Sequence, residues 1–109
     1  MTKYKAKPVE IAGQKYRSML EASRHQVLMI LERAGEISDI RREVPFVLAP
    51  AIKIGRRQKP ALRYYADYVY KDKEGREVVE DVKGMETPVW RIKLHLMATV
   101  HGIEVQTVR

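Results

Sequence analysis

The sequence contains no cysteine, only three histidines, one phenylalanine and one tryptophan. The lack of cysteine excludes disulfide bonds, thiolate zinc sites and cysteine nucleophiles, and three scattered histidines do not make a ligand cluster. No stretch approaches the roughly 20 apolar residues of a membrane span, and the first seven residues lack the apolar run of a secretory signal. We therefore expect a cytoplasmic protein without a membrane partner, whose chemistry would use carboxylates, lysines or hydroxyls.

The excess of positive charge is the most informative feature of the composition. Lysine and arginine total 21 against 14 acids, which gives a net charge of +7. The length of 109 residues is typical of one domain, so we expect a single domain over 1–109. This charge favours a polyanionic partner, although it could also serve solubility alone. Residues 50–63 contain no acid, which favours DNA binding through a basic loop at Lys53, Arg56, Arg57, Lys59 and Arg63.

Hydrophobic periodicity and turn residues predict the order of the secondary-structure elements. The predicted elements are a β-hairpin around Ala12-Gly13, a helix over 18–34, strands over 41–49, 62–71 and 77–83, a helix over 87–102 and a last strand over 103–107. Pro45 places the strand over 41–49 at an edge, because proline cannot donate to a ladder. The spacing of the second helix predicts one apolar stripe of Val89, Ile92, Leu96, Met97 and Val100.

This order predicts an α/β (α+β) fold, a mixed β-sheet flanked by helices, with an N-terminal β-hairpin before an αβββαβ core. A helix between the strand over 77–83 and the last strand makes that pair parallel and the sheet mixed.

Two predicted neighbouring strands carry acids at positions that can meet. Asp81 and Lys83 are two residues apart and share a face of their strand, whereas Glu80 faces the other way and is expected to be structural. Counting back from the turn places Asp67 opposite Glu80 or Asp81. Acids are unfavourable within strands, and Mg²⁺, which takes carboxylate oxygens, would explain them.

These residues, with Glu21 on the preceding helix, resemble the PD-(D/E)XK nuclease superfamily. More closely, the segments Ser18-Met-Leu-Glu21, Gly35-Glu-Ile, Tyr64-Tyr-Ala-Asp67-Tyr and Glu80-Asp-Val-Lys83-Gly84-Met-Glu-Thr87 resemble small phage and prophage endonucleases of that superfamily, which are Holliday junction resolvase-like. The resemblance covers essentially the whole chain and implies a restriction-endonuclease-like core. Ala66 stands where the superfamily name has proline, but it is the acid that performs the chemistry.

The resemblance implies an Mg²⁺-dependent DNA endonuclease, with Mn²⁺ as a substitute metal. By this resemblance Glu21, Asp67, Asp81 and the carbonyl of Val82 bind the metal, and Lys83 positions or activates the attacking water. It also implies DNA as the partner, branched or duplex, a homodimer, and a location in the cytoplasm of a bacterial host.

Each of these residues also has a simpler explanation. Glu21 lies three residues after Ser18, the spacing of a capping box that needs no metal. Asp67 and Asp81 could pair with Lys83 as surface ions. Arg91 and Lys93 on the second helix could contact phosphate or only cover a solvated face. A non-catalytic nucleic-acid-binding module with a nuclease-like fold is the main alternative, and an RNA-binding accessory protein is supported by charge alone.

Overall fold

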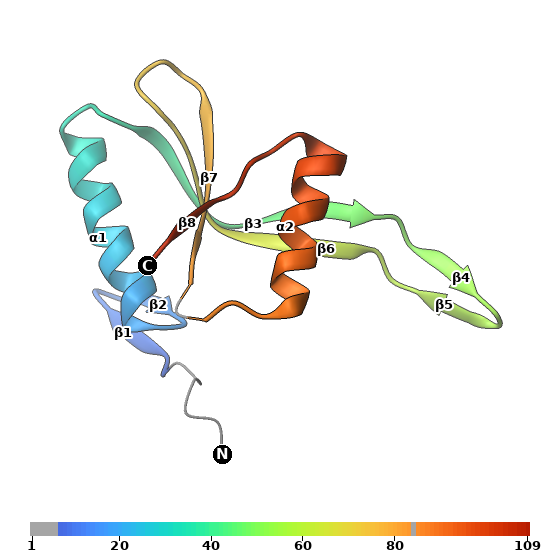
Figure 1. Ribbon diagram of the computed structural model, residues 1–109. Helices are drawn as coiled ribbons and strands as arrows, with labels where there is room; N and C mark the ends of the chain where they lie inside the picture. Colours follow the sequence, from blue (N-terminus) through green and yellow to red (C-terminus); the bar gives the residue numbers. More distant parts are fainter. Residues whose placement is uncertain (1–6, 84) are drawn as a thin grey trace.

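The computed structural model describes residues 7–83 and 85–109 and has a mixed sheet at its centre (Figure 1). The sheet has four strands in the order β3-β6-β7-β8, with bounds Ser38–Ala49, Leu62–Lys71, Glu77–Val82 and Gln106–Val108. Strand β6 is antiparallel to both β3 and β7, and β8 is parallel to β7. The predicted mixed α+β fold is confirmed, and β3, with Pro45, is an edge strand as predicted.

Helix α1 (Met19–Arg33) follows a short hairpin of β1 (Val9–Ile11) and β2 (Gln14–Tyr16). Its first turn is capped by Ser18, whose hydroxyl accepts a hydrogen bond from the Glu21 amide at 3.1 Å. Gly35 follows the helix with a φ of 78°, a left-handed conformation that glycine adopts without strain. These end signals explain why the predicted helix is close to the observed one.

Helix α2 (Pro88–His101) provides the crossover from β7 to β8. Thr87 caps it through a 3.1 Å hydrogen bond from the Trp90 amide, and Gly102 ends it in a left-handed conformation. The predicted apolar stripe is wrong for three of its members, because the helix buries Trp90, which lies outside the stripe, together with Met97. The side chains left exposed on the outer face belong to Val89, Ile92 and Val100.

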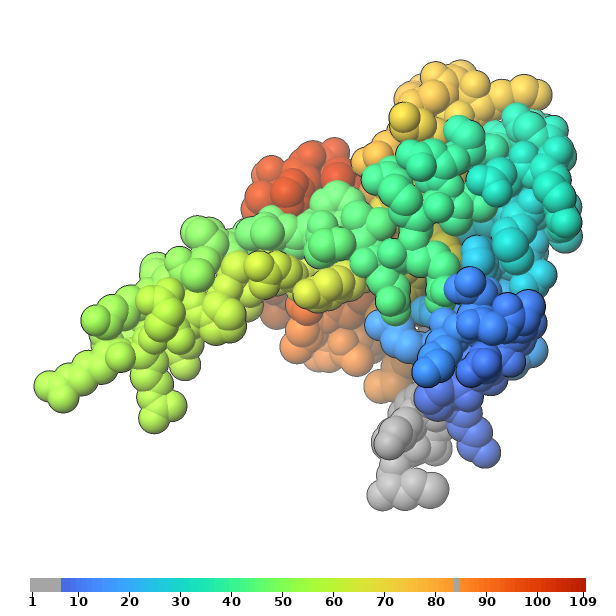
Figure 2. Space-filling view, turned by 180° about the vertical axis from the view of Figure 1, so that it is seen from behind, coloured from blue at the N-terminus to red at the C-terminus, as the bar shows by residue number. Residues whose placement is uncertain are grey.

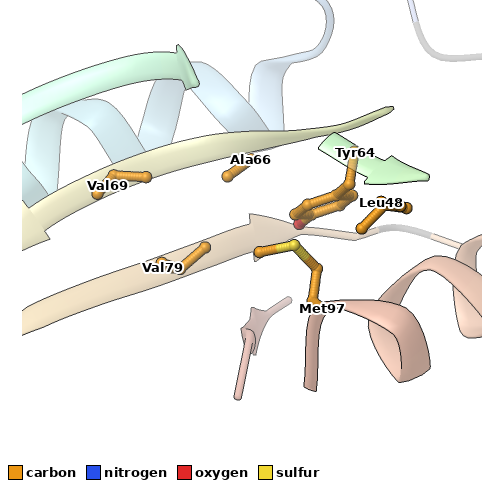
Figure 3. Close-up of a cluster of buried hydrophobic side chains, with 6 residues drawn as sticks. All are labelled: Leu48, Tyr64, Ala66, Val69, Val79 and Met97. Atoms are coloured by element: carbon orange, nitrogen blue, oxygen red, sulfur yellow. The ribbon is translucent and has the colours of Figure 1, made fainter. Parts of the chain in front are cut away.

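The sheet has a hydrophobic cluster on each face. Val69 and Val79 pack with Met97 of α2 (Figure 3), in the cluster that also contains Leu48, Tyr64 and Ala66. Tyr68 and Tyr70 pack with Leu28 of α1 and Ile37. Because adjacent residues of a strand point to opposite faces, the two helices cover opposite sides of the sheet.

A buried polar cluster fixes α1 to its face of the sheet. Glu80 on β7 is only 2% exposed, and both of its carboxylate oxygens accept bonds from Arg24 of α1, at 2.9 and 2.6 Å. The hydroxyl of Tyr70 also donates to Glu80. Glu80 is therefore satisfied within the fold, in agreement with its predicted structural role.

The basic segment is not the predicted loop, because β3 and β6 extend into a two-stranded arm whose tip is a further hairpin. The tip consists of β4 (Ile52–Ile54) and β5 (Arg57–Lys59), and it projects away from the helices (Figures 1 and 2). Gly55 has a φ of 62° at the turn between them. Strand pairing supplies backbone hydrogen bonds that an irregular exposed loop would lack, so an extended ribbon forms even between Pro50 and Pro60.

The starts of β3 and β8 differ from the prediction by three residues each. Strand β3 begins at Ser38 rather than residue 41, with a register shift between Ser38 and Arg41. Strand β8 begins at Gln106, because Ile103 and Val105 pack against the α2 cluster before the chain reaches the edge of β7. Across residues 7–83 and 85–109, none of the helices has the length and apolar character needed to cross a membrane.

Candidate active site

A pocket of about 400 Å³ lies where the start of α1, β6, the end of β7 and the start of α2 meet. It is lined by residues from all four elements, among them the five residues of the predicted metal and catalytic set: Glu21, Asp67, Asp81, Val82 and Lys83. The structure therefore brings together side chains that are up to 62 positions apart in the chain, counting from Glu21 to Lys83.

Asp67 and Asp81 form the acidic centre of the pocket. Tyr68 pairs with Glu80 across the antiparallel strands β6 and β7. The residue before Tyr68, Asp67, therefore lies beside the residue after Glu80, Asp81. Both carboxylates are buried, and the amide of Val82 donates to Oδ2 of Asp67 at 2.8 Å. Burial, and then the neighbouring Asp81, raise the pKa of Asp67 to about 7. A positive charge bound at this pair would therefore reduce the free-energy cost of burying two ionised carboxylates.

Asp81 is oriented by α2 and by its own strand. The indole N–H of Trp90 donates to Oδ2 of Asp81, and Nζ of Lys83 lies 3.6 Å from the same oxygen. The Lys83 ammonium also lies 5.7 Å from the centroid of the Trp90 ring, within cation–π range. Trp90 therefore fixes both the carboxylate and the lysine that the sequence predicts to act together.

Tyr64 adds a buried hydroxyl to the same wall. In the described part of the chain this hydroxyl has no hydrogen-bond partner, although Tyr64 is only 4% exposed. Burial, followed by the nearby charges of Asp81 and Asp67, raises the pKa of Tyr64. A buried polar group without a partner is uncommon and marks a position where a bound group would be stabilised.

Glu21 lies both at the capped start of α1 and in the wall of the pocket. Its backbone takes part in the cap at Ser18, and its carboxylate Oε1 accepts from the Arg17 amide at 3.3 Å, one residue earlier than a capping box requires. The same carboxylate is nearly buried, lies 3.3 Å from Nη2 of Arg42, and lines the pocket. Capping geometry and a place in the site are therefore compatible.

Arg17, which precedes α1, reaches into the pocket. Its guanidinium donates to Oδ1 of Asp67 and lies 3.4 Å from Oε2 of Glu21 and 4.0 Å from Oε1 of Glu43. Burial lowers the pKa of Arg17, but the charges of Asp67 and Glu21 outweigh this and raise it. Glu43 itself has a φ of 53° in β3, a left-handed conformation that is strained for glutamate.

The donor set fits a hard divalent cation, which would be held by the carboxylates of Asp67, Asp81 and Glu21. Carboxylate oxygens are the ligands that Mg²⁺ prefers, and a cation would offset the burial that raises the pKa of Asp67. Within 7–83 and 85–109, no three Asp, Glu or His side chains already converge as a ligand group. The Arg17 guanidinium lies between Asp67 and Glu21, and we attribute their separation to it.

The predicted DNA-contacting residues fall into two groups. On the arm, which projects from the rest of the molecule (Figure 2), five basic residues are exposed: Lys53, Arg56, Arg57, Lys59 and Arg63. Across the described ranges, none of these five has a carboxylate within 4 Å. On α2, Lys93 lines the pocket, whereas Arg91 is exposed and lies 3.5 Å from Glu86.

The residues that line the pocket lie within a segment shared with a known protein family. The chain belongs to the DUF1064 family. The family model matches residues 1–107 and carries the description "protein of unknown function". No curated protein and no solved structure matches the chain. Membership in this family thus extends over nearly the whole chain, and the chemistry has to be inferred from the pocket.

Sequence reasoning misses three residues of the pocket. These residues are Arg17, Tyr64 and Trp90, which the sequence does not single out as part of the site. For Trp90 a signal exists, because a tryptophan at the start of a helix after a strand acid can direct its indole N–H back to that acid. For Arg17 the sequence holds no such signal, since its partner Asp67 is 50 positions away.

Proposed function

We propose that this protein is a metal-dependent endonuclease that hydrolyses phosphodiester bonds in DNA. The observation that carries the proposal is the pair of buried carboxylates, Asp67 and Asp81, in one pocket with Glu21 and Lys83. Burying two neighbouring acids is costly unless positive charge offsets their own, and a bound divalent cation would supply that charge to both carboxylates.

The residues of the pocket have distinct roles in this proposal. Asp67, Asp81 and Glu21 hold Mg²⁺, and the carbonyl of Val82 is a further ligand by resemblance. When bound, the cation neutralises charge on the phosphoryl oxygens and lowers the pKa of a bound water. Lys83, beside Asp81, orients the attacking water and stabilises the negative charge that develops on the phosphate.

The positioning of Lys83 follows from its two contacts. Its ammonium is shared between Oδ2 of Asp81 and the face of the Trp90 ring, and its side chain is 30% exposed. The ammonium is therefore held at the mouth of the pocket, where a phosphate could reach it. Trp90 acts through Asp81 and Lys83, so it is a positioning residue.

The arm supports DNA as the partner. Its five basic side chains are exposed and free of carboxylate neighbours within the described ranges, so their charge is available to phosphates. Lys93 extends the positive charge to the pocket itself. Phosphate contacts fix the position of DNA without reading its sequence. We propose that the arm grips a duplex while the pocket meets the strand to be cut.

Branched DNA, such as a Holliday junction, is the substrate favoured by the resemblance to phage and prophage endonucleases. Each chain supplies one acidic pocket, and cutting two strands in concert needs two pockets, so we propose a homodimer acting on DNA in a bacterial host cell. Light scattering on the purified protein, with and without DNA, would measure the oligomeric state.

Cleavage of labelled DNA tests the proposed activity. A four-way junction and a duplex of the same sequences are incubated with the protein in EDTA, Mg²⁺ or Mn²⁺, with Asp81→Asn as the inactive control. We expect cleavage only with metal, more on the junction than on the duplex, and none with Asp81→Asn. Metal-independent cleavage, or equal cleavage by Asp81→Asn, would refute the proposal.

A second function, a non-catalytic nucleic-acid-binding module, is favoured by the position of Arg17. Its guanidinium already provides a positive charge for Asp67 and Glu21, as a degenerate metal site would require. In that case the protein binds the junction with the same affinity in EDTA and in Mg²⁺ and cleaves none of it. The same labelled substrates distinguish the two functions.

A further inference from the structure

Arg17 differs from the other arginine that pairs with a buried acid of this sheet. Arg24 makes two bonds to Glu80, and its side chain is 23% exposed. Arg17 bonds to Asp67, which is 4% exposed, while its own side chain is 62% exposed. The first arginine is locked into the fold, and the second enters the pocket from the solvent side.

The carboxylates around Arg17 come from three separate elements. Asp67 is on β6, Glu21 is on α1 and Glu43 is on β3, so no single element fixes the guanidinium. The other acid of the pair, Asp81, has the Lys83 ammonium at 3.6 Å. Asp67 and Glu21 therefore depend on Arg17, with Arg42 beside Glu21, for their positive charge.

The place that Arg17 occupies is the place a divalent cation requires. Asp67 and Glu21 both belong to the proposed ligand set, and the guanidinium lies between their oxygens. A cation held by both carboxylates would lie on the same side of them. Two positive groups cannot occupy this space together, because at close range they repel each other in a partly buried site.

We propose that Arg17 is a built-in competitor of the divalent cation: it neutralises the acidic pocket in the metal-free protein and is displaced when the cation binds. This inference rests on the proposed function, since it assumes that the pocket binds a metal. As a consequence, a higher cation concentration is needed to fill the site, because metal binding must break the contacts of Arg17 with Asp67 and Glu21. The high exposure of the side chain lets it leave without unfolding any element.

Calorimetric titration with Mg²⁺ and Mn²⁺, without DNA, measures the competition directly. Arg17→Gln removes the guanidinium but keeps a polar, uncharged side chain, and we expect it to bind the cation about tenfold more tightly than wild type. Arg76→Gln is the matched control. It removes one positive charge from the β6–β7 turn, where Arg76 is 75% exposed and pairs only with Asp72 and Glu74 among the described residues.

Nuclear magnetic resonance separates displacement from a simple change in charge. The Nε–Hε signal of Arg17, assigned by its loss in Arg17→Lys, should move during a Mg²⁺ titration with the dissociation constant found by calorimetry. The signal of Arg24 should stay in place, because its pair with Glu80 lies on the other face. Arg17→Lys also provides a charged variant if Arg17→Gln folds poorly.

The outcomes distinguish this inference from the proposed function. If wild type binds the cation but the Arg17 signal does not move, or if Arg17→Gln binds no more tightly than Arg76→Gln, Arg17 is not a competitor and the proposed function stands. If neither wild type nor Arg17→Gln binds a cation, with or without DNA, the metal site itself is wrong and the inference fails with it.

Discussion

Replacing Asp67 by asparagine should make the metal-free protein more stable at high pH. The folded state raises the pKa of Asp67 to about 7, because the carboxyl is buried and lies beside Asp81. An unfolded aspartate has a pKa near 3.9, so the folded protein binds this proton more tightly than the unfolded chain does. Stability from this group is therefore complete below about pH 4 and is lost as the pH rises through 7.

The expected size follows from the two pKa values. Between pH 5 and pH 8, ionisation of Asp67 should lower the free energy of unfolding by roughly 2 to 3 kcal/mol, since each unit of pKa difference corresponds to about 1.4 kcal/mol. An asparagine side chain does not ionise, so the Asp67→Asn variant should lack this loss. For a domain of this size, the melting temperatures of the two proteins should separate by about 10 °C or more over that range.

Thermal unfolding in EDTA between pH 5 and 8 measures this difference. Glu104→Gln is the control, because Glu104 is an exposed carboxylate before β8. Added Mg²⁺ should stabilise wild type more at pH 8 than at pH 5 and leave Asp67→Asn unchanged, since the metal needs the ionised carboxylate. Parallel stability curves for wild type and Asp67→Asn would refute the burial argument, and a normal Mg²⁺ response of the variant would remove Asp67 from the ligand set.

Three further predictions address the other residues of the site and the arm. The Glu21→Gln variant should melt within a few degrees of wild type but need far more Mg²⁺ for cleavage. In contrast, Ser18→Ala should lower the free energy of unfolding by about 0.5 to 2 kcal/mol without changing the metal dependence. A fully active Glu21→Gln enzyme would exclude Glu21 from the set of metal ligands. Lys83→Ala should bind junction DNA with near-normal affinity in Ca²⁺ and cleave it at least 100-fold more slowly, on the order expected for removal of a general base or charge stabiliser; a near-normal rate would reduce Lys83 to an ion-pair partner. Alanine substitutions on the arm, at Arg56, Arg57 and Lys59, should reduce the dependence of duplex affinity on salt. The slope of log affinity against log salt concentration should flatten by up to about 0.9 for each phosphate that is no longer bound. An unchanged slope would place the DNA away from these three residues.

Most of the fold could be predicted from the sequence because its helix ends and central strands carry local signals. Ser18 and Thr87 cap the two helices, Gly35 and Gly102 follow them, and strand periodicity marks β6 and β7. The arm could not be predicted, because its pairing depends on β3 and β6 continuing beyond the sheet. The exposure of the outer face of α2 also could not be predicted, since periodicity indicates an apolar stripe but not whether another layer covers it.

The acidic part of the site followed from the two-residue period of strands and the length of one turn. That reasoning places Asp67 opposite Glu80 or Asp81 and puts Glu80 on the other face from Asp81, and the structure has Asp67 beside Asp81. Arg17 was out of reach, because its contact with Asp67 depends on how the N-terminal hairpin approaches the sheet in space. Side chains that act through tertiary approach leave little trace in local spacing.

The clamp between Arg24 and Glu80 has a consequence for the accuracy of the pocket. Glu80 and Asp81 are adjacent acids on β7, so a slip of that strand by one residue would exchange the faces on which they lie. Such a slip would place Val79 or Asp81 beneath Arg24, and the two bonds of Arg24 to Glu80 would be broken. The alignment of the acids in the pocket thus depends on an arginine on the opposite side of the sheet, which does not line the pocket.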